Sequence, residues 1–227
     1  LGFAPDRVDA IVTRLAALER IEINGWLTHL ACADDPSRPE TQAQLDVFAQ
    51  VTAGRPGLRS IANSAGVLGW PAAHADVVRP GIMLYGSSPM SDRDASSYDL
   101  KPAMHLCAPL IARSPIAAGE TIGYGATWRT PEAMDIGVIG IGYGDGYPRH
   151  APSGTPVLID GVRVPLVGRV SMDMITVDLR NAPNAKVGDR ATLWGGGLDP
   201  DEVARHADTI AYELFCRLTP RVRFEVI

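Results

Sequence analysis

The first ninety residues alternate between two hydrophobic periods. Apolar side chains first recur every three or four positions, which predicts helices, and then form short continuous runs, which predict buried strands. Helices that alternate with strands are typical of a parallel α/β sheet. We expect helices at residues 8–18, 42–51 and 65–68, and strands at residues 21–27, 58–62 and 77–78.

The pattern changes after residues 87–99, a segment rich in Ser, Asp and Pro that predicts a linker. Beyond it, short apolar runs are separated by turns, which favours a sandwich-like or barrel-like β domain. Asp160-Gly161 between two of these runs is typical of a two-residue hairpin turn. The sequence therefore predicts an α/β domain at 1–95 and a β-rich domain at 96–227. Strands are expected at 106–112, 136–141, 155–159, 163–167, 174–179 and 191–194, with one helix at 200–206.

Composition narrows the class of protein. The 227 residues are 46% hydrophobic and 21% charged, which is ordinary for a globular chain. No apolar run approaches the roughly 18 residues that a membrane span needs. The net charge of −5 argues against a general nucleic-acid or membrane-surface binder.

The cysteines and the first residues add two expectations. Cys32, Cys107 and Cys216 are scattered without a CxxC pair, so we expect neither a metal site nor a disulfide framework, and a reducing, cytoplasmic setting. The chain begins Leu1-Gly2-Phe3, without an initiator methionine or a signal pattern. That start predicts a fragment or a processed product, which we expect to be unstable as an isolated monomer.

Polar residues follow the predicted strands at the positions where α/β barrels carry their chemistry. These are His29, Asn63-Ser64 and Arg79. Each has a purely structural alternative: a lone His is often structural, Ser64 fits a helix N-cap, and Arg79 fits a buried ion pair. A phosphate bound at the start of a helix would also use Ser64 and nearby backbone N–H groups.

Three glycine-rich segments stand out in the second domain. Tyr124 lies between two glycines, residues 142–149 contain three glycines and two tyrosines, and residues 168–174 pair Arg169 with Asp173. Glycine permits unusual backbone angles and close approach of a ligand, but each segment also fits a turn or a bulged strand. The spacing of residues 142–149 does not match a dinucleotide-binding loop.

Taken in order, these segments resemble the alanine racemase family, whose members use pyridoxal 5′-phosphate (PLP). The family's fold is a (β/α)8 TIM-type barrel followed by a mostly β domain, so the resemblance implies that residues 1–95 are the C-terminal part of a barrel. The resemblance runs along the whole chain and rests on residues 28–34, 62–65, 78–86, 123–125, 140–147, 168–173 and 211–213.

The resemblance implies a two-base racemisation of L- and D-alanine. One base is a PLP-bound lysine and the other is the tyrosine that Tyr124 resembles, acting from the neighbouring subunit of a homodimer. His29 and Arg79 resemble the residues that form a hydrogen-bonded chain to this tyrosine, and Arg79 also resembles the partner of the pyridine nitrogen. Met172 resembles the residue whose backbone N–H binds the substrate carboxylate, beside Tyr124.

The remaining positions implied by the resemblance fall into two groups. The cofactor-binding set is Asn63, Ser64, Arg79, Gly81, Ile82 and Tyr212. The substrate entryway is Asp34, Tyr147, Arg149, Arg169 and Ile210.

Two departures from the family pattern are clear. Ser171 stands where the family usually has a cysteine, which is tolerable because the backbone of Met172 is the functional part. The only lysines, Lys101 and Lys186, lie in the predicted linker and in a turn, so neither fits the PLP lysine, which we expect outside this chain. The substrate-binding arginine that precedes Leu-Gly-Phe in the family is also absent, and a separate N-terminal chain could supply both groups.

Two other functions stay open. One is a PLP racemase for another amino acid, such as serine or lysine. The other is a non-catalytic scaffold that kept the fold, which the missing lysine favours and the joint presence of Tyr124, His29, Arg79, Ser64 and Met172 opposes. The sequence does not distinguish D-alanine supply for peptidoglycan from alanine breakdown.

Overall fold

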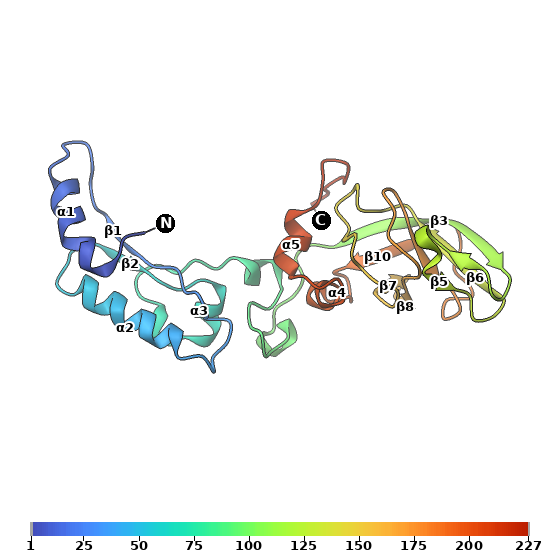
Figure 1. Ribbon diagram of the computed structural model, residues 1–227, viewed down its shortest axis with the longest axis horizontal. Coiled ribbons are helices and arrows are strands. Elements are labelled where there is room, and N and C mark those ends of the chain that lie inside the picture. Colours follow the sequence, from blue (N-terminus) through green and yellow to red (C-terminus); the bar gives the residue numbers. More distant parts are fainter. Residues whose placement is uncertain (1, 227) are drawn as a thin grey trace. The chain divides into compact units, whose positions relative to one another are not determined.

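The computed structural model describes residues 2–226, and the chain divides into two compact units (Figure 1). The first unit ends at Leu100 and the second begins at Lys101. The boundary predicted at 95/96 lies a few residues earlier, inside a short 3-10 helix that closes the first unit. No helix within residues 2–226 has the length and apolar character needed to cross a membrane.

The first unit alternates helices with parallel strands. Its strand pair aligns Gly25 with Leu58 and Leu27 with Ser60, and an isolated parallel bridge joins Ser60 to Val77. The two strands are shorter than predicted, because residues 21–24 lie outside the ladder. The elements are α1 (Val8–Ala16), β1 (Gly25–Leu27), α2 (Glu40–Thr52), β2 (Leu58–Ser60) and α3 (Ser64–Gly69), with 3-10 helices at Pro5–Arg7, Pro71–Ala73, Ile82–Tyr85 and Ala95–Tyr98.

The core of the first unit is small and lies around α2 and α3. It contains Leu30, Leu45, Ile61 and Ala62. In the described chain, α1 has no buried side chain, although its apolar residues recur at helical spacing. Leu27 and Leu58, on the two strands, are each more than half exposed. The unit therefore leaves much of its apolar surface uncovered.

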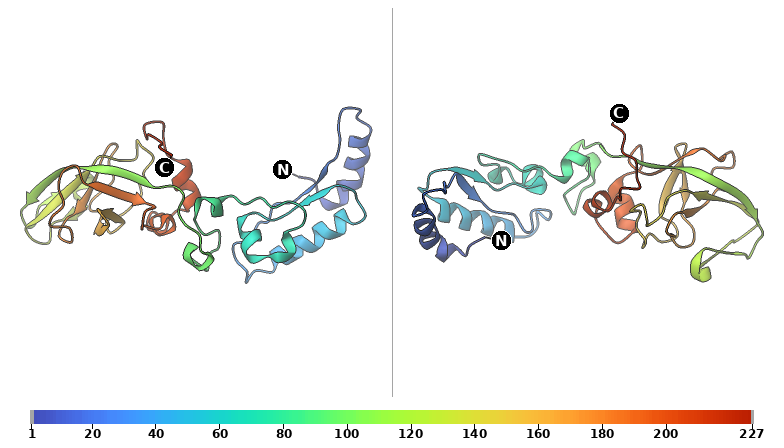
Figure 2. Two further views of the ribbon diagram at one scale, coloured as in Figure 1. Left: turned by 180° about the vertical axis from the view of Figure 1, so that it is seen from behind. Right: turned by 90° about the horizontal axis from the view of Figure 1, so that it is seen from above.

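The second unit is built on a six-stranded antiparallel sheet in the order β8-β7-β10-β3-β6-β9. Figure 2 shows the long strand β3 extending along this unit. A separate two-stranded ribbon, which the sequence pattern did not predict, pairs Thr121 with Arg129. The strands are β3 (Leu106–Ile116), β4 (Thr121–Ile122), β5 (Trp128–Arg129), β6 (Met134–Ile139), β7 (Pro156–Ile159), β8 (Val162–Pro165), β9 (Ile175–Asp178) and β10 (Arg190–Trp194).

The predicted hairpin turn joins β7 to β8. Ile159 pairs with Val162, which leaves Asp160 and Gly161 as the two loop residues. Both have positive φ angles, 44° and 83°, as a type I′ turn requires.

A contiguous apolar core fills the second unit. Trp194 and Tyr147 are its largest fully buried side chains, and their rings stack with centroids 6.2 Å apart. Two short helices pack against each other, α4 (Pro200–His206) and α5 (Ala211–Cys216), and α4 also contacts β10. The apolar spacing predicted α4 with these bounds, whereas α5 was not predicted.

Candidate active site

His29 and Arg79 lie together at the carboxyl ends of the first unit's strands. The Arg79 guanidinium donates to the carbonyl of Thr28 at 2.9 Å, to Ser60 Oγ at 2.7 Å and to the carbonyl of Ile61 at 3.2 Å. The same Nη2 atom lies 3.4 Å from Nδ1 of His29. One arginine therefore joins the ends of β1 and β2. Its acceptors are carbonyl and hydroxyl oxygens, whereas the structural alternative was an ion pair with a carboxylate.

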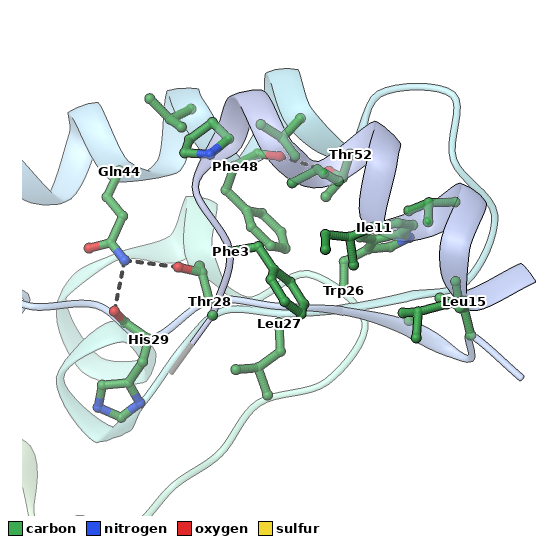
Figure 3. A pocket seen from close by; sticks show the side chains of 18 residues that line it. Phe3, Ile11, Leu15, Trp26, Leu27, Thr28, His29, Gln44, Phe48 and Thr52 are labelled. Atoms are coloured by element: carbon green, nitrogen blue, oxygen red, sulfur yellow. Dashed lines mark hydrogen bonds between the residues drawn. The ribbon is translucent and has the colours of Figure 1, made fainter. Parts of the chain in front are cut away.

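The segment that carries His29 is held by Gln44 on α2. The Gln44 amide donates to the His29 carbonyl at 2.7 Å and to Thr28 Oγ1 at 2.9 Å (Figure 3). Because Gln44 contacts this segment without touching the imidazole, the His29 ring stays exposed with Arg79 beside its Nδ1 atom.

Ser64 collects backbone N–H groups from the loop that follows Arg79. Its buried hydroxyl accepts from Gly81 N at 2.7 Å and from Met83 N at 3.4 Å. The side chain of Asn63 accepts from Gly66 N at 2.9 Å and so caps α3. Ile82, between the two N–H donors, is buried.

This donor set fits a phosphate group. The N–H groups of Gly81 and Met83 both donate to the Ser64 hydroxyl oxygen, which leaves the hydroxyl proton of Ser64 to be donated to an anionic oxygen. Gly81 leaves the approach open, since a Cβ atom there would lie 3.7 Å from Ser64 Oγ. The residues present are therefore compatible with the phosphate of PLP.

Tyr124 lies in a glycine turn of the second unit. Gly123 and Gly125 have φ angles of 74° and 76°, and Tyr124 is 71% exposed. Arg169 packs behind this turn, because a Cβ atom on Gly125 would lie 3.2 Å from its Nη1 atom. The glycines are required both for the backbone angles and for the space that Arg169 fills.

Met172 lies on a loop that contacts the glycine-rich segment 142–147. Tyr143 N donates to the Ser171 carbonyl at 3.0 Å, and Gly144 N donates to the Met172 carbonyl at 2.8 Å. The Ser171 hydroxyl donates to the Met174 carbonyl at 2.7 Å and so closes the turn. Serine at this position thus has a structural role, and Met172 remains about half exposed.

The predicted entryway residues are divided between the two units. Asp34 is exposed in the first unit, and its carbonyl accepts from Ser91. Arg169 and Ile210 are exposed in the second unit, and Arg149 is partly buried. Ile210 precedes α5, whose first turn contains Tyr212, 45% exposed.

The structure corrects the assignment of Tyr147 to the entryway. Tyr147 is 1% exposed and stacks on Trp194 inside the core, where burial raises the pKa of its phenol. A side chain enclosed by the core cannot line a passage for solutes. Tyr143, 38% exposed on the same segment, is the tyrosine at the surface. Its signal in the sequence was the glycine on each side, the same setting that marked Tyr124.

Both lysines lie at the surface of the molecule. Lys101 is exposed at the unit boundary. Lys186 is exposed and begins a turn that Asp189 closes by accepting from the Lys186 N–H. Among residues 2–226, no cluster of three or more His, Cys, Asp or Glu side chains could hold a metal ion.

Comparison with known proteins places both units in one family. The sequence model described as "Alanine racemase, C-terminal domain" matches residues 103–226, and "Alanine racemase, N-terminal domain" matches residues 1–89. The chain is 56% identical to an alanine racemase of Halorhodospira halophila and 51% identical to one of Shewanella sediminis. These matches cover 100% and 98% of this chain, but it spans only 63% and 62% of those relatives.

Solved structures give the same result. The biosynthetic alanine racemase from Pseudomonas aeruginosa matches with a TM-score of 0.94 and 50% identity, covering 98% of this chain and 62% of that one. The alanine racemase from Bartonella henselae with covalently bound pyridoxal phosphate matches with a TM-score of 0.85 and 31% identity, covering 97% and 61%.

Proposed function

The chain belongs to the alanine racemase family, and from that premise we propose that it acts in the PLP-dependent interconversion of L- and D-alanine. The observation that carries the proposal is the cluster at the strand ends of the first unit. There, Arg79 joins His29 to β1 and β2, and Ser64 gathers the N–H groups of Gly81 and Met83. A scaffold without chemistry has no use for both groups.

PLP supplies an electron sink that makes the Cα proton of an amino acid acidic enough to leave. The Ser64 hydroxyl would hold its phosphate, together with the backbone of Gly81 and Ile82. Arg79 would face the pyridine nitrogen. A guanidinium cannot readily lose its proton, so Arg79 would donate a hydrogen bond there without protonating the ring.

Tyr124 is proposed as one of two bases. An ordinary phenol has a pKa of about 10, so it needs neighbouring donors to act as a base near neutral pH. In the proposed homodimer, His29 and Arg79 of one subunit would supply those donors to Tyr124 of the other. The second base is a lysine that we place outside these 227 residues.

Substrate binding is assigned to the second unit. The backbone N–H of Met172 would bind the alanine carboxylate beside Tyr124. Arg149, Arg169 and Ile210 of this unit would line a narrow polar approach that favours a small zwitterion. We also propose a cytoplasmic location, since the three cysteines are unpaired, as a reducing compartment requires.

The test is racemisation in D2O by the PLP-loaded full-length protein, that is, these 227 residues together with the segment that supplies the lysine. We expect L-alanine to yield D-alanine with deuterium at Cα, and Tyr124→Phe to lower the rate by at least about 100-fold, the loss typical of removing a general base. Tyr98→Phe, in the first unit, is the matched control. Faster reaction of serine or lysine would reassign the substrate, and absence of both product and deuterium exchange would contradict the proposal.

A further inference from the structure

We propose that Arg221 is a positioning residue that holds the Met172 loop ready for the substrate carboxylate. Arg221 Nε lies 3.2 Å from Asp145 Oδ1, and its Nη2 donates to Asp173 Oδ1 at 2.7 Å. Asp145 belongs to the glycine-rich segment 142–147, and Asp173 follows Met172. One guanidinium therefore ties together the two loops. The inference rests on the proposed function only in assigning the Met172 N–H to the carboxylate.

The geometry of the loop shows what this tie would hold. The Ser171 carbonyl accepts from Tyr143 N at 3.0 Å, which fixes the orientation of the peptide between Ser171 and Met172. In a planar trans peptide the N–H points opposite to the carbonyl. The Met172 N–H is therefore directed away from segment 142–147. Any slippage between the two loops would rotate this donor.

The segment that carries Arg221 is itself anchored to the glycine-rich loop. Thr219 N donates to the Asp145 carbonyl at 3.1 Å, and Thr219 Oγ1 donates to the Gly144 carbonyl at 2.9 Å. Gly144 provides the space for the guanidinium, because a Cβ atom there would collide with Arg221 Nη1. The two carboxylates and the missing side chain together define one position for the arginine.

Charge and shape both favour arginine here. The hydrogen bond to Asp173 and the charge of Asp145 hold the pKa of Arg221 above its ordinary value, so the side chain stays cationic at any working pH. Arg221 is half exposed, and a single exposed ion pair would contribute little to stability. A planar guanidinium that binds both carboxylates instead fixes the distance between the loop of Asp145 and the loop of Asp173. The single ammonium of a lysine would hold this distance only in part.

Hydrogen exchange of the PLP-loaded protein tests the tie without reference to activity. We expect Arg221→Ala to speed amide exchange at residues 171–174 by about tenfold, as local opening of a loop does, while the β7–β8 hairpin exchanges as in the wild type. Arg221→Lys should give an intermediate rate. Arg223→Ala is the matched control, since Arg223 is 87% exposed and pairs with Glu225.

Kinetics tests the role of the tie. Arg221→Ala should raise KM for alanine about tenfold with kcat within about threefold, the pattern of lost ground-state binding, and Arg221→Lys should recover part of it. The inference would be overturned if amide exchange at 171–174 were unchanged in Arg221→Ala, or if Arg223→Ala had effects as large as Arg221→Ala. It would also be overturned if exchange became faster while KM stayed unchanged. A full-length wild-type protein that contains the lysine and still lacks racemase activity would instead overturn the proposed function. The exchange result would still decide whether Arg221 holds the loop.

Discussion

Arg79 Nη2 lies 3.4 Å from His29 Nδ1, although fifty positions separate the two residues in the sequence. The contact forms because each residue follows a strand of the parallel sheet and the carboxyl ends of such strands meet at one edge. Three further hydrogen bonds from Arg79 to the strand ends make this edge rigid. The pairing of His29 with Arg79 therefore depends on the arrangement of the sheet, and no local sequence motif produces it.

Arg79→Lys should reduce kcat/KM for alanine by about 100-fold. A single ammonium cannot reach all of the carbonyl and hydroxyl oxygens that the guanidinium joins, and even a small displacement of reacting groups lowers the rate strongly. Steady-state kinetics on the PLP-loaded variant measures this. Arg38→Lys, which alters an exposed pair with Glu40, is the control. Equal activity of the two variants would show that the Arg79 fork is dispensable.

Ser64→Ala should weaken PLP binding by about tenfold, the loss of one charge-assisted hydrogen bond. It also removes the acceptor for Gly81 N and Met83 N, so the cofactor-free protein should lose about 1–3 kcal/mol of unfolding free energy. Absorbance titration with PLP and chemical denaturation give the two quantities. The exposed Ser96→Ala serves as control, and unaltered PLP affinity would remove Ser64 from the phosphate site.

Gly125→Ala should lower kcat by about 10- to 100-fold by displacing Tyr124. The added Cβ would lie 3.2 Å from Arg169 Nη1, at a φ of 76° that favours glycine. Gly119→Ala separates the two causes, because its φ is 83° and a Cβ there meets nothing within 4 Å. If both variants lose activity equally, backbone strain alone explains the effect and the contact with Arg169 is irrelevant.

Tyr147→Phe should leave KM for alanine unchanged and stability equal or higher. Within the described residues the Tyr147 hydroxyl is buried without a hydrogen-bond partner, so removing it abolishes a desolvation cost of about 1 kcal/mol.

Burial raises the pKa of the folded Tyr147 phenol, so the unfolded chain ionises first, near pH 10. The stability from this group is complete below that pH and falls as the pH rises above it. Denaturation from pH 8 to 11 should show this fall in the wild type and a smaller one in Tyr147→Phe; a raised KM would restore Tyr147 to the entryway.

The 227-residue chain expressed alone should self-associate. A hollow of about 990 Å³ opens between α1, β1 and α2 and is lined largely by apolar side chains, Phe3, Ile11 and Phe48 among them (Figure 3). Exposed apolar surface of this kind promotes association in water. Sedimentation velocity should show larger species at higher concentration, reduced by Val47→Lys in the hollow and not by the exposed Val187→Lys of the second unit. A monomer at all concentrations would contradict the expectation.

The sequence by itself determined the kinds of element and the chemical groups of the candidate site. Helical spacing predicted α1 and α2, and the Asp160-Gly161 dipeptide predicted the β7–β8 turn, because these depend on local backbone preferences. The resemblance of short motifs then marked His29, Ser64, Arg79, Tyr124 and Met172. The sequence did not predict the two-residue strands β4 and β5 or the short helix α5, because such short elements contain too few residues to show a hydrophobic period.

Only the tertiary structure decided what each of these groups contacts. Two tyrosines in the segment 142–147 look alike in sequence, yet packing against Trp194 buries Tyr147 and leaves Tyr143 at the surface. Asn63 became a helix cap, and Arg221 became the link between Asp145 and Asp173. Burial and long-range pairing depend on which distant segments meet, and a local pattern of hydrophobic and polar residues does not contain that information.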